Sequence, residues 1–262
     1  MARVKLIGVD CAVRARSVGI AVARVEDGVV TIESLTLGTG KGTLANAMAP
    51  TLGAIIDEAD PVILALDAPL GWPSTLADAL QGHRAGERIG ILGDADGYVY
   101  RRTDEKVGET ITWPLDVGAN FIARTAFAAL ELLSKLRERG RKLPMLWTPG
   151  VVEDGVIEVY PKATFMARGW PVKDYKGKGP NARGARARLL DLMSTELTIP
   201  EDPRATAVET DHALDAIACV LAAKDFADGN VVPCAAEDRE RAEREGWIWF
   251  RPPLTPTRGS TR

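Results

Sequence analysis

The stretch VKLIGVD, from Val4 to Asp10, decides the fold assigned to the rest of the chain. Its nearly unbroken apolar run predicts a β-strand that is buried on both faces. The run stops at an acid, Asp10. A second apolar run, VILAL over residues 62–66, stops in the same way at Asp67. One aspartate at the end of a strand is ordinary, but acids delivered by separate elements indicate a metal site at the edge of a sheet.

Two further strands are expected after the first one. Residues 17–23 are mostly apolar, and residues 29–37 alternate between apolar and polar side chains. The dipeptide Asp27-Gly28 between them is typical of a tight hairpin, because such turns require a positive φ. We therefore predict an antiparallel meander. Residues 43–59 then carry apolar residues at helical spacing, and a helical crossover would place the Asp67 strand parallel to the first strand.

The second half of the chain is expected to be mainly helical. The predicted elements are a strand over 156–160 and helices over 120–139, 183–197 and about 206–226. In the first of these helices, Phe121, Ala128, Leu132 and Leu136 line one apolar face. The last helix would begin at the capping box TAVE, which starts at Thr206.

We predict a single domain over residues 1–262. Residues 68–118 are rich in Gly, Pro and charge, and are interpreted as an insertion over the C-terminal edge of the sheet. Residues 230–262 form a tail in which Trp247 and Trp249 share one face; we expect them to pack on the domain, with stacking on a base as the alternative. The fold class is α/β, with a mixed five-stranded sheet flanked by helices, which is the element order of the ribonuclease H-like fold.

The composition excludes several classes of protein. The net charge of −3 gives no overall polycation, so a nucleic-acid partner would need a local basic surface. The three cysteines lie far apart without a CxxC pair, which argues against a disulfide framework or structural zinc and favours a reducing compartment. We find no signal peptide and no run of roughly 18 apolar residues, so we expect a cytoplasmic protein without membrane contact.

Six motifs occur in order along nearly the whole chain: Gly8-Val9-Asp10, Leu66-Asp67-Ala68-Pro69-Leu70-Gly71, Arg101-Arg102-Thr103-Asp104, Glu158-Val159-Tyr160-Pro161, Asp211-His212-Ala213-Leu214-Asp215-Ala216 and Glu245-Gly246-Trp247-Ile248. They resemble the family of predicted ribonuclease H-like nucleases called domain of unknown function 429. Asp10 and the acids of the late helix also resemble RuvC-type Holliday-junction resolvases. The resemblance implies a ribonuclease H-like fold and a metal-dependent nuclease site. This chain has Asp67 where many nucleases of the superfamily have a glutamate, which is one methylene longer.

Hydrolysis of a phosphodiester with two metal ions needs three or four carboxylates around the cations. Mg²⁺ or Mn²⁺ would suit such oxygen ligands. We therefore name four aspartates as catalytic residues and metal ligands: Asp10, Asp67, Asp211 and Asp215. Asp10 would bridge the metals, and the strand acid Glu158 is a further candidate ligand. Asp211 and Asp215 are spaced i, i+4, so they share one face of the helix.

Each of these polar residues also has a plainer interpretation. Asp211 and Asp215 would be solvated near a helix N-terminus, whose dipole favours anions. Glu158 would face outward from its strand, and Asp104 would be either a ligand or a salt-bridged loop acid. His212 is a candidate proton shuttle, although a lone histidine is more often structural or on the surface.

The densest positive charge lies between Lys173 and Arg188. We predict that Lys176, Lys178 and Arg183 bind the substrate, and that Arg102 grips a phosphate. The plainer interpretation of the basic stretch is a solvated loop and helix face.

These observations predict a Mg²⁺- or Mn²⁺-dependent nuclease that acts on DNA or RNA. One alternative is an ATP-binding phosphotransferase or ATPase of the actin/sugar-kinase superfamily, because Gly8-Val9-Asp10 followed by Ser17-Val18-Gly19-Ile20 resembles its first phosphate hairpin. Another is a non-catalytic nucleic-acid-binding protein on the same fold. A homodimer is a candidate assembly in each case.

Overall fold

The computed structural model describes residues 4–58, 61–89 and 95–254. Ala59, the predicted last residue of the first helix, and residues 255–262 of the tail lie outside these ranges.

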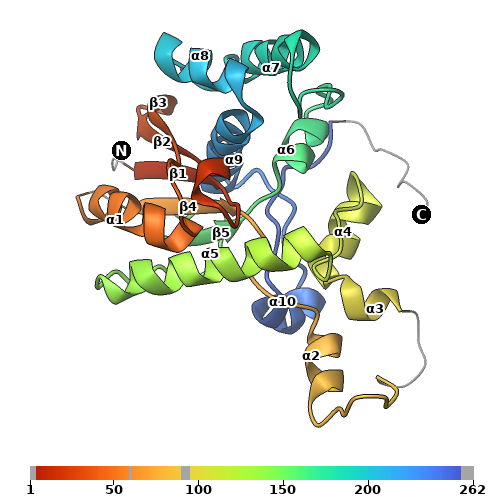
Figure 1. The fold of residues 1–262 in the computed structure, drawn as a ribbon. Helices are drawn as coiled ribbons and strands as arrows, with labels where there is room; N and C mark the ends of the chain where they lie inside the picture. Colours follow the sequence, from red (N-terminus) through yellow and green to blue (C-terminus); the bar gives the residue numbers. More distant parts are fainter. Residues whose placement is uncertain (1–3, 59–60, 90–94, 255–262) are drawn as a thin grey trace.

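A mixed sheet forms the centre of the fold (Figure 1), with the strand order β3-β2-β1-β4-β5. The strands are β1 (Val4–Asp10), β2 (Gly19–Glu26), β3 (Val29–Leu37), β4 (Val62–Asp67) and β5 (Gly155–Glu158). β1, β2 and β3 pair antiparallel, whereas β4 runs parallel to both β1 and β5. The predicted five-stranded mixed sheet is confirmed, and its order and directions are consistent with a ribonuclease H-like fold.

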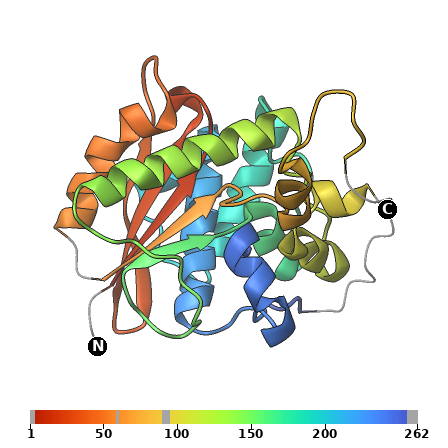
Figure 2. The same ribbon diagram turned by 90° about the horizontal axis from the view of Figure 1, so that it is seen from below.

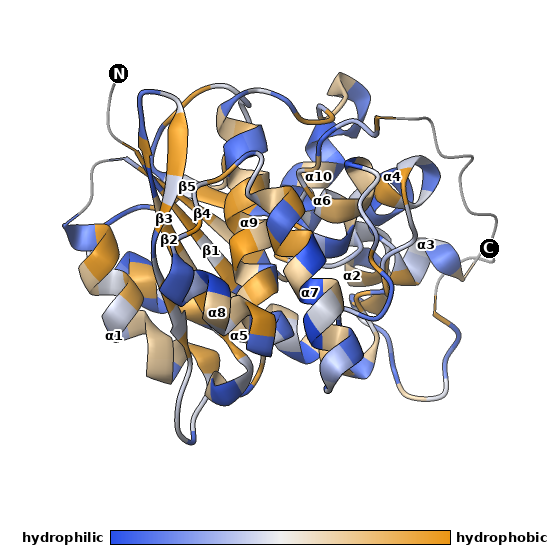
Figure 3. Cartoon of the chain, turned by 90° about the horizontal axis from the view of Figure 1, so that it is seen from above, coloured by the Kyte–Doolittle hydropathy of each residue, from blue (hydrophilic) through white to orange (hydrophobic). Residues whose placement is uncertain are grey.

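Helices cover both faces of the sheet. α1 (Leu44–Asp57) and α5 (Asn120–Glu138) lie side by side on one face, as Figure 2 shows, and α9 (Asp211–Ala227) covers the other. The helices that pack on α9 are α6 (Pro161–Ala167), α7 (Pro180–Met193) and α8 (Glu201–Glu209). The strongly apolar α9 is enclosed between the sheet and these helices (Figure 3). No helix in the described ranges has the length and apolarity needed to cross a membrane.

Two glycines let α9 lie directly on the sheet. A Cβ atom at Gly8 of β1 would lie 2.2 Å from the carbonyl oxygen of Ala216, and one at Gly19 of β2 would lie 2.1 Å from that of His212. Both distances are too short for any side chain. The first turns of α9 are therefore held against the end of β1 that carries Asp10.

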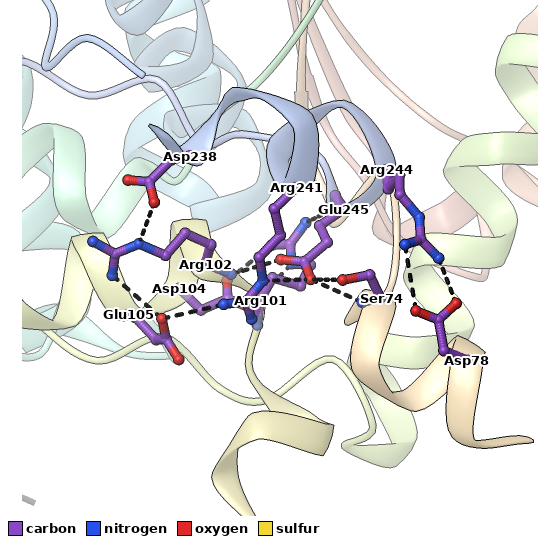
Figure 4. Close-up of polar contacts among 10 residues, drawn as sticks. All are labelled: Ser74, Asp78, Arg101, Arg102, Asp104, Glu105, Asp238, Arg241, Arg244 and Glu245. Atoms are coloured by element: carbon purple, nitrogen blue, oxygen red, sulfur yellow. Dashed lines mark hydrogen bonds and ion pairs between the residues drawn. The ribbon is translucent and has the colours of Figure 1, made fainter. Parts of the chain in front are cut away.

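The insertion after β4 contains three short helices, α2 (Ser74–Leu80), α3 (Asp96–Val99) and α4 (Arg102–Thr110). The tail contributes α10 (Arg239–Glu245), which packs between α2 and α4. The buried Glu245 carboxylate of α10 links this helix to α2 and α4 (Figure 4). It accepts hydrogen bonds from the backbone of Ser74 in α2 and of Arg102 in α4, and from the Arg241 side chain in α10 itself. The insertion and the tail thus form one hydrogen-bonded unit beside the sheet.

Two local predictions were wrong. Thr206 does not cap a helix: it lies inside α8, where its hydroxyl donates to the carbonyl of Asp202 (3.0 Å), and the cap of α9 is Thr210, whose Oγ1 accepts from the His212 backbone N–H (3.3 Å). The S/T-x-x-E pattern is here an accident of helix composition. Phe121 is 78% exposed, because the buried positions of α5 begin only at Ala126.

Candidate metal centre

Strand alternation directs two of the predicted acids toward α9. Leu6 and Ala65 pack in the core under α9, whereas Ile7 and Val9 pack against α1 and α5. Successive side chains of a strand point to opposite faces. Asp10 therefore lies on the same face as Leu6, and Asp67 lies on the same face as Ala65. Asp10 and Asp67 are also direct neighbours in the parallel register of β1 and β4. The two carboxylates therefore leave the sheet side by side on the same face.

Asp215 of α9 completes a cluster of three acids. One carboxylate oxygen each from Asp10, Asp67 and Asp215 lies within 4.8 Å of the others. Opposite ligands of one octahedral Mg²⁺ are about 4.2 Å apart, because each bond is about 2.1 Å long. Asp10 is 7% and Asp215 2% exposed, and Asp67 is half-buried. The donor type and the spacing suit a hard divalent cation.

The cluster is electrostatically unfavourable without added positive charge. Burial, followed by the charges of Asp10 and Asp215, raises the pKa of Asp67 well above its usual range. Burial also raises the pKa of Asp215 to about 7, although Lys176 opposes the shift. The pKa of Asp10 is raised by burial and only partly lowered by His212. Three acids with raised pKa values at one point are typical of a functional site.

Two basic side chains contact the cluster. The Lys176 ammonium lies 3.0 Å from Asp215 Oδ2, while the rest of its side chain reaches in from the 171–179 loop and is 60% exposed. Although burial alone would lower the pKa of Lys176, the charges of Asp215 and Asp67 raise it. His212 Nδ1 forms a hydrogen bond of 2.7 Å with Asp10 Oδ2, and this bond raises the pKa of the imidazole.

The cluster also leaves buried polar atoms unsatisfied. Within the described ranges, Asp215 Oδ1 and the Tyr175 hydroxyl have no hydrogen-bond partner of acceptable geometry. Tyr175 is 3% exposed, and its pKa is raised by burial and by the neighbouring Asp215. A buried carboxylate oxygen without a donor is costly. A bound cation would satisfy it, so the residues present fit a divalent metal.

Two predicted ligands stand outside the cluster. Asp211 is the first residue of α9 and half-buried; its charge raises the pKa values of Asp10 and Asp215, but its oxygens are not part of the group that converges. The residues of α9 that reach the cluster are His212 and Asp215, spaced i, i+3. The structure thus brings Asp215 of the predicted i, i+4 pair into the converging group and leaves Asp211 outside it.

Glu158 points to the other side of the sheet. It lies on the same face of β5 as Val156, which packs against α1 and α5, whereas Asp10 and Asp67 face α9. Its carboxylate receives two hydrogen bonds from Arg101, at 2.7 and 2.9 Å, and one from the Leu70 backbone at 3.0 Å. The assignment of Glu158 as a metal ligand is therefore corrected: it is the partner of a buried arginine.

The salt-bridged interpretation of Asp104 agrees with the structure. Its two oxygens accept from Arg101 Nε (3.0 Å) and Nη2 (2.9 Å), so Arg101, only 1% exposed, joins the insertion to β5. Arg101 was missed as a key residue, because its partner Glu158 is distant in sequence. Arg102, predicted to grip a phosphate, instead pairs with Asp238 at 2.8 Å and with Glu105 at 3.3 Å.

Of the three basic residues predicted to bind the substrate, one contacts the acid cluster and two do not. Lys176 lies at the cluster, as described above. Lys178 is exposed and has no ion pair within the described ranges, and Arg183 is exposed but pairs with Glu209 at 3.3 Å. Neither contacts the acids. Trp247 and Trp249 are buried in the core under α9, which agrees with their predicted packing role.

A cleft of about 290 Å³ opens beside the cluster. Asp10, Asp67 and Lys176 form part of its charged lining, and Leu115 and Ile122 form part of its apolar lining. Leu115 is 69% exposed. The acids are thus reachable from solvent through an opening that offers both charged and apolar contacts.

The fold and the site define an α/β protein with a buried triad of acids that fits a divalent cation. The chain matches the family described as "Protein of unknown function (DUF429)" over residues 8–240, and it belongs to that family. No curated protein matches the chain.

Proposed function

We propose that this protein is a Mg²⁺- or Mn²⁺-dependent nuclease that hydrolyses phosphodiester bonds of DNA or RNA. The observation that carries the proposal is the convergence of Asp10, Asp67 and Asp215 from β1, β4 and α9 to within 4.8 Å, with one buried oxygen unsatisfied. A fold has no structural need for three mutually repelling acids at this point.

Asp10, Asp67 and Asp215 are the residues that would hold the metal. When bound, the metal would supply an activated water and charge stabilisation for phosphoryl transfer. The His212 bond to Asp10 orients that carboxylate, as outer hydrogen bonds do in metal sites. His212 Nε2 forms no hydrogen bond with any described residue, and the ring is half-exposed. In this proposal His212 would carry a proton to or from solvent.

Lys176 has a second role in this proposal. Its ammonium is the only cation of the basic stretch in contact with the acids among the described residues. Because the side chain is long and largely exposed, it can turn from Asp215 toward a phosphate oxygen that enters the cleft. Lys176 would then neutralise the substrate rather than the protein.

Incubation with labelled single-stranded, duplex and branched DNA and RNA in Mn²⁺ tests the activity. We expect at least one substrate to be cut, and Asp10→Asn to lower the rate by about 100-fold or more, since the loss of even a supporting residue of a metal site often costs 10- to 100-fold. Asp211→Asn is the matched control, because it removes an acid just outside the cluster, and it should retain most of the rate. If no substrate is cut, or if Asp10→Asn cuts equally well, the nuclease proposal fails.

The two alternatives give different results in binding experiments. A phosphotransferase or ATPase would be stabilised against heat by ATP with Mg²⁺. A non-catalytic nucleic-acid-binding protein would bind oligonucleotides but no divalent cation. The cytoplasmic location, the single domain, the nucleic-acid partner and the homodimer remain predictions from the sequence.

A further inference from the structure

A second cavity, of about 280 Å³, has a different chemistry from the acid cleft. It is lined by Arg14, Arg16, Gly40, Lys41 and Gly42. Three of these five residues are cations, and no acid lines the cavity. Such a composition suits an anion and would repel a metal ion.

The fold holds the two sides of this cavity together. The loop after β1 contains a 3₁₀ turn at Ala15–Ser17, and the loop after β3 leads into α1. The Ala15 N–H donates to the carbonyl of Gly42 (3.1 Å), and the Gly38 N–H donates to that of Val18 (2.9 Å). The cationic residues are therefore carried by two loops that are fixed to each other.

The three cations are not neutralised by the protein. The side chains of Arg14, Arg16 and Lys41 are exposed and form no ion pair or hydrogen bond within the described part of the chain. By contrast, Arg101 and Arg168 each bind two carboxylates. Like charges around one concavity repel, and a bound anion would relieve that repulsion.

The backbone of the β3–α1 loop adds to the site. Gly40 has φ 80°, and a Cβ atom placed on Gly40 or Gly42 would meet nothing within 4 Å. The N–H groups of Gly40, Lys41 and Gly42 donate to no acceptor in the described ranges. Free N–H groups on a glycine-rich loop ahead of a helix are a common arrangement for phosphate oxygens.

The cavity lies at the same edge of the sheet as the acid cluster. Asp10 ends β1 and pairs with Gly19, the first residue of β2, which in turn pairs with Leu37 at the end of β3. The cationic loops follow Asp10 and Leu37 directly. Because neighbouring strands are about 4.8 Å apart, the end of β3 lies roughly 10 Å from the end of β1 along this edge.

We propose that Arg14, Arg16 and Lys41 form a phosphate-binding site that holds the backbone of a polynucleotide whose next segment reaches the acid cluster. The inference rests on the proposed function for its choice of polymer, but the phosphate site itself does not depend on cleavage. It assigns the substrate as a strand that extends from the cluster toward β3.

Fluorescence anisotropy with a labelled 20-nucleotide single strand, in EDTA so that nothing is cut, tests the site. The test variant carries Arg14→Gln, Arg16→Gln and Lys41→Gln. The control carries Arg84→Gln, Arg88→Gln and Lys142→Gln, three exposed residues outside both the cavity and the basic stretch from Lys173 to Arg188, and so has the same net charge. Thermal unfolding of both variants should match the wild type, because all six side chains are exposed.

We expect the test variant to bind about tenfold more weakly and to lose about 2 from the slope of log affinity against log salt, since each single-strand phosphate contact contributes about 0.7. The control should stay within about threefold of the wild type. Equal affinity of the two variants would overturn the site.

A competition arm separates the sources of phosphate. Inorganic phosphate and ATP should displace the labelled strand only at millimolar concentrations. Displacement by ATP at micromolar concentrations, lost in the test variant, would overturn the polynucleotide assignment in favour of a free nucleotide. The anisotropy assay contains no divalent cation and measures no cleavage, so a failed nuclease assay would leave this result standing.

Discussion

Replacing Asp215 by asparagine should stabilise the metal-free protein at alkaline pH. Asp215 is 2% exposed, and its pKa is raised from 3.8 to about 7 by burial. The folded state therefore holds this proton more tightly than the unfolded state. Stability is lost as the pH rises from about 4, where the unfolded carboxyl ionises, to about 7. At 1.36 kcal/mol for each unit, a shift of about 3 units costs about 4 kcal/mol at pH 8 and about 2 kcal/mol at pH 5.

Urea unfolding of EDTA-treated protein at the two pH values measures this cost. Asp215→Asn should raise the free energy of unfolding by about 4 kcal/mol at pH 8 and by about half of that at pH 5. Its partner Lys176 is 60% exposed and returns to water without penalty. A loss of stability at pH 8, or an equal gain at both pH values, would show that burial does not hold a proton on Asp215.

Asp104→Asn is the matched control for this experiment. Asp104 is as buried as Asp215, at 1% exposed, but both of its oxygens are bonded to Arg101. Asp104→Asn weakens these bonds and leaves Arg101 with Glu158 as its charged partner, so we expect a destabilisation of about 1.5–3 kcal/mol, the usual contribution of hydrogen bonds to charged groups. The same substitution at two buried acids should thus act with opposite sign.

Three further outcomes are expected. Mn²⁺ should raise the melting temperature more at pH 8 than at pH 6, because the acids of the cluster must ionise to bind it; a larger rise at pH 6 would contradict this sign. Glu158→Gln should destabilise the protein by about 1.5–3 kcal/mol, because Arg101 loses its bonds to a charged Glu158 but keeps those to Asp104, without changing the Mn²⁺ affinity in a calorimetric titration. Gly8→Ala should cost about 3 kcal/mol in urea unfolding, because its Cβ would meet the Ala216 carbonyl; a neutral effect would show that α9 lies further from β1.

The sheet and two of its acids were predictable from local patterns. Between the apolar runs that end at Asp10 and Asp67 lie two strands and one helix, which predicts that the two runs are parallel with their acids at one edge of the sheet. Their direct pairing in register comes from the structure. Alternation within β5 indicates that Glu158 shares a face with Val156. Whether that face also carries Asp10 and Asp67 depends on the strand order and on which face α9 covers, and neither follows from the sequence of β5.

The site residues of α9 were harder to predict, because a helix rotates by about 100° for each residue. His212 and Asp215 face Asp10 only because α9 begins after Thr210 and rests on Gly8 and Gly19. Neither constraint is visible without the packed structure. The same holds for Arg101, whose partner Glu158 is 57 positions away.

Calorimetric titration of Mn²⁺ into EDTA-treated protein tests whether Asp10, Asp67 and Asp215 bind a divalent cation. We expect saturable binding to the wild type, about tenfold or more weaker binding to Asp10→Asn and to Asp67→Asn, and unchanged binding to Glu158→Gln. Heat no greater than that of dilution, or equal affinity for the wild type and Asp10→Asn, would contradict a metal site formed by Asp10, Asp67 and Asp215.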